Sequence, residues 1–151
     1  MLALENESYF SEVTRLLAEG HSVTIPTKGS SMLPFIVGGR DRVVLCPAVA
    51  LQTGDIVLAH LPEYGYVLHR IYRLSGNEVT LMGDGNIKAV ERCRVEDVVG
   101  RVAGILRNGR CVDCLSPVAR RRARLWRQLL PLRRCLLFVY KKLMGRAWEA
   151  C

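Results

Sequence analysis

Short apolar runs with a period of two, separated by turns, constrain the fold of this chain most. Such alternation is typical of strands, whose successive side chains point to opposite faces of a sheet. Stretches rich in Gly, Asn, Asp and Ser separate the runs, and Asn108-Gly109 is typical of a tight hairpin. The predicted strands are residues 21–25, 42–46, 55–59, 66–72, 78–82, 97–106 and 110–112.

Many short strands with close turns favour a mainly β fold, with a curved mixed or antiparallel sheet that is partly closed towards a barrel. Ahead of the strands, apolar residues recur at helical spacing, and Gly20 follows them as a helix stop. We therefore expect a short amphipathic helix over residues 7–19 that covers one side of the sheet. Its apolar positions are Tyr9, Phe10, Val13, Leu16 and Leu17.

Charge divides the chain into two parts. The net charge is +8, but from Arg120 onward ten Lys and Arg residues stand against one acid, Glu149, and the preceding residues carry −1. Leucines and aromatic residues interleave with the basic residues of this tail, and Pro131 interrupts them once. We predict a domain over residues 1–118 and a basic amphipathic helical tail over residues 119–151, with one or two helices within residues 120–148.

The composition of the tail suggests its partner. A basic amphipathic segment with aromatic residues suits the interface of an anionic membrane, which we expect residues 120–148 to contact. A helix packed on the domain or on a second copy remains an equal alternative, because amphipathicity alone does not separate the two. Nucleic acid is disfavoured, since the leucine and aromatic content exceeds what phosphate contact requires.

Two further features bear on localisation and cofactors. No cleavable signal peptide is visible, and no stretch approaches the ~20 apolar residues of a membrane span, so we expect a peripheral membrane-associated or a cytoplasmic protein. Cys111 and Cys114 form a single C-x-x-C without a second pair or a nearby His. Because a zinc site needs four ligands, the sequence predicts no metal and no cofactor.

The segment Gly29-Ser30-Ser31-Met32-Leu33-Pro34 places paired hydroxyls on a turn. Gly, Ser and Pro are common in turns for conformational reasons alone, whereas a nucleophilic serine also needs a base and an orienting acid. Of three histidines, His69 lies in an alternating apolar row, where an imidazole must find hydrogen-bond partners. Taken singly, His69 is explained as a hydrogen-bonded histidine of the core. Asp84, in the segment Gly83-Asp84-Gly85-Asn86, is explained as an aspartate that stabilises a turn.

Taken together, the motifs and their order resemble the type I signal peptidases. Within that family they are most similar to the endoplasmic-reticulum and archaeal type, in which histidine replaces the lysine base of the bacterial enzymes. The resemblance covers roughly residues 23–105. Its matching stretches are Ser31-Met32-Leu33-Pro34, Gly54-Asp55-Ile56-Val57, Val67-Leu68-His69-Arg70-Ile71, Gly83-Asp84-Gly85-Asn86 and Asp97-Val98-Val99-Gly100-Arg101-Val102.

This resemblance implies the coiled β fold of the signal peptidase and LexA-like peptidases, and serine endopeptidase activity on peptide or preprotein substrates. It assigns the nucleophile to Ser31 and the base to His69, and we take Asp84 as the orienting acid. Backbone N–H groups near residues 29–31 are candidate oxyanion donors. Candidate supporting residues are Gly29, Ser30, Asn86 and Glu91, and the motif residues that shape the fold or substrate site are Met32, Pro34 and Arg70.

The chain departs from the family pattern at the acid. In histidine-type relatives a second acid follows the Asp of Gly-Asp-x-Asn by six positions, whereas here that position is Val90, with Glu91 next. Three possibilities stay open: Asp84 orients the histidine, Glu91 reaches in from a shifted loop, or the triad is incomplete.

Two alternative functions follow from the same motifs. An incomplete triad would make the chain a non-catalytic binding module that retains the fold. A self-cleaving regulator of the LexA kind is disfavoured, because such proteins need an Ala-Gly or Cys-Gly bond before the serine. None of the bonds among the thirty residues ahead of Ser31 is of that kind.

Overall fold

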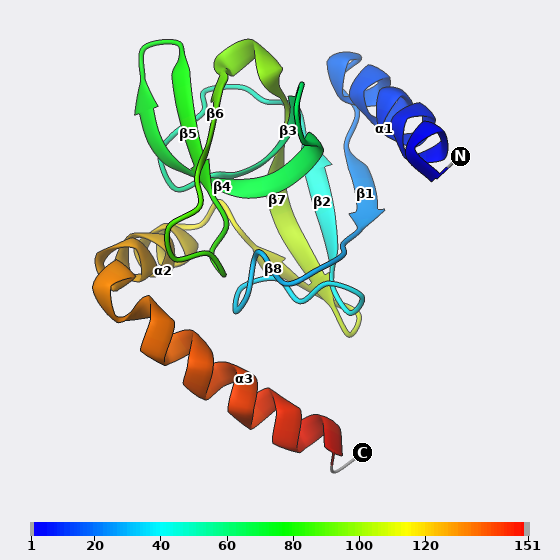
Figure 1. Cartoon of the computed structure of the whole chain (residues 1–151). Helices are drawn as coiled ribbons and strands as arrows, with labels where there is room; N and C mark the ends of the chain where they lie inside the picture. The colour runs from blue at the N-terminus through cyan, green and yellow to red at the C-terminus, as the bar shows by residue number, and fades with distance from the viewer. Residues whose placement is uncertain (1, 150–151) are drawn as a thin grey trace.

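Eight strands form one sheet, in which every paired strand is antiparallel to its neighbour (Figure 1). The computed structural model describes the backbone of residues 2–149 and the side chains of residues 7–145. The strands are β1 (Val23–Pro26), β2 (Arg42–Cys46), β3 (Ile56–Leu61), β4 (Gly65–Ser75), β5 (Glu78–Met82), β6 (Glu91–Arg94), β7 (Val98–Arg107) and β8 (Arg110–Asp113). The α-helices are α1 (Leu2–Ala18), α2 (Pro117–Gln128) and α3 (Arg133–Glu149).

The prediction of a mainly β protein is confirmed, and the sheet is antiparallel. Its strand order is β1-β2-β7-β3-β4-β5-β6, with β8 paired to the end of β7. Among the described residues β1 and β6 do not pair with each other, so the sheet is open and the expected closure towards a barrel is not reached. The pairing of β2 with β7 shifts register between Val44 and Leu45, and the pairing of β3 with β7 shifts between Leu58 and Ala59.

Strand β3 is buried on both faces and separates two apolar clusters. Ile56 and Leu58 belong to the cluster that α1 covers with Val13 and Leu17. The alternate β3 residues Val57, Ala59 and Leu61 belong to the second cluster, with Ile71, Val79 and Leu81 from β4 and β5. The period of two in the sequence therefore distributes the core over both faces of the sheet.

The N-terminal helix covers the sheet as predicted and is one turn longer than the expected residues 7–19. It contacts β1 and β7. Leu17 lies so close to Gly100 of β7 that a Cβ at residue 100 would lie 2.7 Å from a Leu17 methyl carbon. The glycine in this strand thus permits the close approach of helix and sheet.

The basic tail forms helices broken near Pro131, as predicted. Ser116 caps α2, since its Oγ accepts a hydrogen bond of 3.1 Å from the Ala119 N–H, and Pro117 occupies the first turn. A short 3₁₀ helix over Leu130–Leu132 contains Pro131 and connects α2 to α3. Figure 1 shows α2 beside the loops of the sheet and α3 running away beneath them.

The first part of the tail is packed on the sheet domain. Ala123 and Trp126 are buried, and the Trp126 indole N–H donates a hydrogen bond of 2.9 Å to the Asp84 carbonyl oxygen. The predicted boundary at residue 118 falls at the second residue of α2. Of the helices that the structure describes, none combines the length and the apolar composition that a bilayer span requires.

Candidate active site

The loop after β1 carries Ser31 and folds tightly on itself. Gly29 has a φ of +77°, in the left-handed region that favours glycine. Gly38 lies against the backbone of Gly29, where any side chain would overlap it. The loop thereby leaves Ser31 half-buried on the wall of a cavity, whereas Ser30 is exposed and does not line it.

The imidazole of His69 projects from β4, opposite Val57 of β3. The His69 side chain is 10% exposed, and its Nδ1 lies 2.9 Å from Glu91 Oε2, whose side chain is 14% exposed. When Nδ1 carries the proton it donates to Glu91, and Nε2 is then the free acceptor. The Glu91 carboxylate is therefore the hydrogen-bond partner that the His69 imidazole needs among its apolar neighbours.

Nε2 of His69 lies beside the serine loop. A Cβ built on Gly83 would lie 3.2 Å from Nε2 and would overlap the Ser31 carbonyl oxygen. The N–H of Gly85 also donates a hydrogen bond of 2.8 Å to this carbonyl. Because Gly83 has no side chain, the serine loop and strand β4 can approach each other here.

Ser31 and His69 line the same cavity, of about 630 Å³. Within the described residues no direct hydrogen bond joins their side chains. Nucleophile–base contacts are often long in unliganded enzymes and tighten when substrate binds, so a reactive pair does not require this bond before substrate binds.

Asp84 is placed differently from the sequence-based expectation. Both of its carboxylate oxygens accept hydrogen bonds from Arg70, Oδ1 from Nε at 2.8 Å and Oδ2 from NH2 at 2.7 Å. Arg70 donates a further bond of 2.8 Å to the Gly54 carbonyl oxygen. With Arg70 on both oxygens, Asp84 anchors the loop, while Glu91 holds the orienting position at His69 Nδ1.

Strand β4 and helix α2 meet the serine loop at Phe35. The Arg70 guanidinium lies 5.0 Å from the Phe35 ring centroid, and Trp126 packs edge-on against Phe35 at 5.9 Å. Sequence reasoning missed Phe35 and left open whether the aromatic residues of the tail, Trp126 among them, face a membrane or pack on the domain. The signal was present, since Ala123 and Trp126 are three residues apart on one face of α2.

Other sequence candidates take supporting places. Met32 is buried, and its sulfur accepts the Asp84 N–H at 3.5 Å. The Asn86 carbonyl oxygen accepts a bond of 3.0 Å from Arg133.

The described residues contain no group of three or more His, Cys, Asp or Glu side chains arranged to hold a metal. Burial raises the pKa of the Cys114 thiol to about 11.

Unpaired strand edges border the cavity. β1 is the end strand of the sheet and contributes Ile25 and Pro26 to the wall. Residues 65–69 of β4 pair only with β3, because β5 joins β4 from Arg70 onward. An extended peptide in the cavity therefore has unpaired backbone groups of β1 and β4 with which to form hydrogen bonds.

The Ser31 backbone N–H makes no hydrogen bond within the described part of the chain. It is a donor available to an oxygen bound beside Ser31 Oγ. Neither protein-family models nor curated proteins give a match to this chain.

Proposed function

We propose that the chain is a serine endopeptidase of the signal-peptidase type, with the fold of that family. One observation carries the proposal: Ser31 and His69 line one cavity, and Glu91 holds the His69 nitrogen that is turned away from Gly83 and the serine loop. Ser31, His69 and Glu91 thus occupy the places of nucleophile, base and orienting acid that peptide hydrolysis by a serine requires.

The chemistry follows from these contacts. A serine hydroxyl barely ionises at neutral pH, so His69 Nε2 takes its proton as Oγ attacks the peptide carbonyl carbon. The Ser31 N–H stabilises the resulting oxyanion, and Glu91 stabilises the imidazolium. The imidazolium then protonates the leaving amine as the C–N bond breaks. Water, deprotonated by the same nitrogen, hydrolyses the acyl-enzyme and restores Ser31.

The substrate is an extended peptide. The free edges of β1 and of residues 65–69 supply backbone partners along the cavity, as in strand addition. Met32, Ile36, Leu58 and Leu68 make the wall of the cavity apolar. Small or apolar side chains next to the scissile bond suit such a wall.

The nucleophile is tested by a matched pair of serine variants. Ser31→Ala should abolish both fluorophosphonate labelling and peptide cleavage, while Ser30→Ala, one residue away and exposed, should retain both. Both variants should unfold at the wild-type temperature, because neither hydroxyl has a hydrogen-bond partner in the described chain. A labelled and active Ser31→Ala protein would refute the assignment, and an unlabelled wild-type protein would favour the non-catalytic binding module.

The orienting acid is tested at Glu91. Glu91→Gln should lower kcat by roughly 10²–10⁴-fold, the range for general acid–base catalysis, with little change in KM. His69→Ala should lower activity at least as much, and the double variant should add little, since the two groups act as a unit. Full activity of Glu91→Gln would remove Glu91 from the mechanism.

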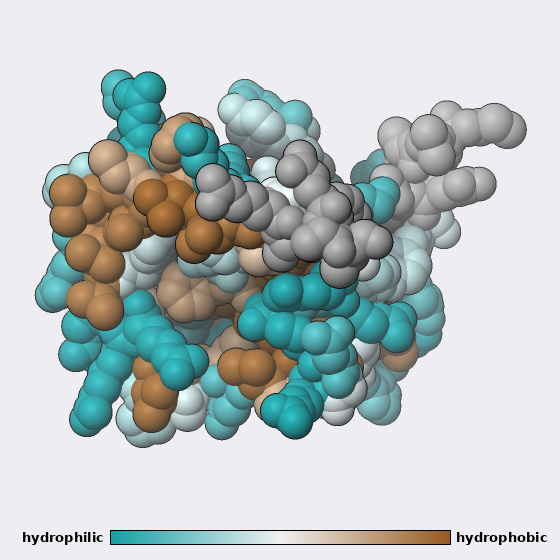
Figure 2. Space-filling view, turned by 90° about the horizontal axis from the view of Figure 1, so that it is seen from below, coloured by the Kyte–Doolittle hydropathy of each residue, from teal (hydrophilic) through white to brown (hydrophobic). Residues whose placement is uncertain are grey.

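We infer that α3 brings the enzyme to an anionic membrane. Leu132, Leu136, Val139 and Leu143 form an apolar stripe at helical spacing, and each is at least 39% exposed. Exposed Arg134 and Lys141 lie on the opposite side of α3, and exposed Lys142 lies beside this stripe. Figure 2, which looks onto the molecule from below, shows apolar side chains interspersed with hydrophilic ones. Apolar insertion beside basic residues is the pattern of interfacial helices.

Vesicle co-sedimentation tests this inference. The triple variant Leu136→Ser, Val139→Ser, Leu143→Ser should lose sedimentation with phosphatidylserine vesicles, because these exposed residues supply the apolar contact. Phe35→Leu, a change inside the domain, is the control and should sediment as the wild type does. Equal sedimentation of the triple variant, or its conversion of a dimer to a monomer in solution, would contradict the membrane role.

A further inference from the structure

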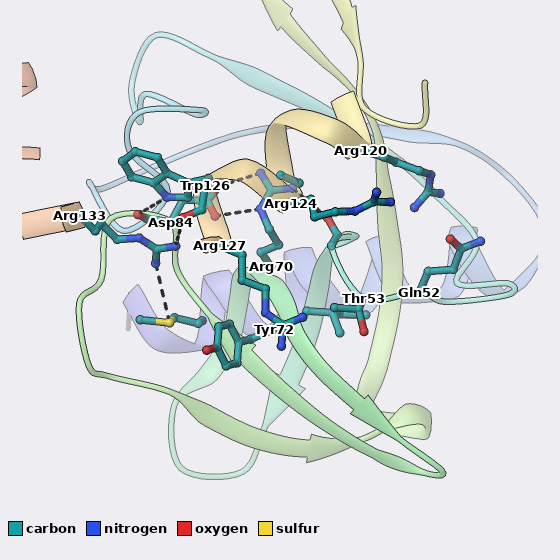
Figure 3. Close-up of a pocket in the computed structure, with 14 residues that line it drawn as sticks. Gln52, Thr53, Arg70, Tyr72, Asp84, Arg120, Arg124, Trp126, Arg127 and Arg133 are labelled. Atoms are coloured by element: carbon teal, nitrogen blue, oxygen red, sulfur yellow. Dashed lines mark hydrogen bonds and ion pairs between the residues drawn. The ribbon is translucent and has the colours of Figure 1, made fainter. Parts of the chain in front are cut away.

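A second cavity, of about 350 Å³, lies between α2 and the loop that precedes β3, and arginines dominate its wall (Figure 3). Its acidic lining residue is Asp84, and its polar lining residues include Thr53 and Gln52. It is separate from the cavity that holds Ser31 and His69, with which it shares no lining residue. The lining arginines are Arg70, Arg120, Arg124, Arg127 and Arg133.

Carboxylates balance only part of this positive charge. Asp84 pairs with Arg70, and Asp55 lies 3.1 Å from Arg120. Within the described side chains, Arg124, Arg127 and Arg133 have no carboxylate within ion-pair distance. Arg127 instead stacks over the Tyr72 ring, 4.4 Å from its centroid. The cavity therefore carries an excess of positive charge.

The three α2 arginines share one helix face. Arg120, Arg124 and Arg127 are spaced by four and three residues, so their side chains are neighbours on the helix surface. Like charges at this spacing destabilise a helix, and the sequence of α2 contains no acid to offset them. Figure 3 shows Arg127 extending from α2 towards Tyr72.

Arg133 adds an independent observation. It is 3% exposed, yet its buried Nε has no hydrogen-bond partner, although NH1 and NH2 donate to the carbonyls of Asn86 and Trp126 at 3.0 and 3.2 Å. Burial lowers the pKa of this guanidinium. A buried cation with an unsatisfied donor is costly unless an anion compensates it.

We propose that this cavity binds a phosphate group. Guanidinium forks match phosphate oxygens in pairs, and Arg124, Arg127 and Arg133, which lack a carboxylate partner, all line this cavity. The volume leaves room for a phosphate with a small substituent. Both a free phosphate compound and the headgroup of phosphatidic acid present this chemistry. The site is distinct from the peptidase centre and does not depend on its activity.

Thermal unfolding and isothermal titration calorimetry on the full chain test the proposal, with inorganic phosphate against sodium chloride at equal ionic strength. A ligand that binds only the folded state raises the unfolding temperature, and the stabilisation grows with the logarithm of one plus the ratio of ligand concentration to Kd. Phosphate should raise it and chloride should not. Water-soluble dihexanoyl phosphatidic acid forms a second arm, and tighter binding of this lipid than of phosphate would identify a headgroup as the source.

Matched double variants keep the result specific. Arg124→Gln with Arg127→Gln should weaken phosphate binding by about 10-fold or more, the scale of a lost charged hydrogen bond. Arg121→Gln with Arg134→Gln removes the same charge at exposed positions outside the cavity and should bind as the wild type does. Equal weakening in both double variants, or no phosphate effect beyond that of chloride, would overturn the proposal.

Discussion

Replacing Trp126 by alanine tests whether the beginning of the basic tail is part of the folded domain. The Trp126 side chain is 9% exposed and fills the space between α2 and the Asp84 loop. It contacts Phe35 edge-on, and the Arg133 guanidinium lies 5.1 Å from its ring centroid. The substitution therefore removes a large buried side chain that joins three segments.

The size of the effect follows from this burial. Truncating a buried tryptophan to alanine costs about 3–5 kcal/mol through lost apolar contact and the cavity that remains. Loss of the indole N–H also leaves the buried Asp84 carbonyl oxygen without this donor. For a chain of 151 residues each kcal/mol shifts the unfolding temperature by about 2–4 °C. Trp126→Ala should thus lower it by roughly 6–20 °C.

Far-UV circular dichroism during thermal unfolding measures the shift without relying on tryptophan fluorescence. Leu125→Ala is the matched control, since Leu125 is the preceding residue of α2 and is 56% exposed. This control should unfold within about 2 °C of the wild type, because exposed substitutions change stability by less than ~0.5 kcal/mol. Equal unfolding temperatures for Trp126→Ala and Leu125→Ala would refute the packing of α2 on the domain.

Three further predictions concern the loops and the helix cap. Desolvation alone would raise the pKa of Asp41, but hydrogen bonds from Arg40, Arg107 and the Val37 N–H lower it from 3.8 to about 2. The lowered pKa contributes about 2 kcal/mol to the free energy of unfolding above pH 4, and this contribution is lost as the pH falls towards 2. In urea titrations the free energy of unfolding of Asp41→Asn should therefore fall less between pH 4 and pH 2 than that of the wild type. Gly83→Ala should abolish the proposed peptidase activity in a cleavage assay, because its Cβ would overlap the Ser31 carbonyl. Ser116→Ala should destabilise the chain by about 1 kcal/mol in the same titration, through the lost α2 cap.

The sequence by itself determined the elements that depend on local pattern. Residues 42–46 and 78–82 were predicted as strands with the bounds that β2 and β5 have, because alternation and flanking turns report a strand without reference to its neighbours. The break at Pro131 was equally local, since proline lacks the N–H that a continuous helix needs. Strand β6 was missed because Glu91–Arg94 is a polar edge strand with no apolar run.

Tertiary structure decided which acid meets the histidine. Glu91 lies opposite Leu81 in β6–β5 pairing, and Leu81 lies opposite Ile71 in β5–β4 pairing, so two registers carry Glu91 across the sheet towards His69. Spacing from the Gly-Asp-x-Asn motif pointed to Val90 instead. Because successive strand residues face opposite sides of a sheet, a one-residue difference decides whether a carboxylate or an apolar side chain faces the imidazole. Strand pairing sets this register, and no local pattern reports it.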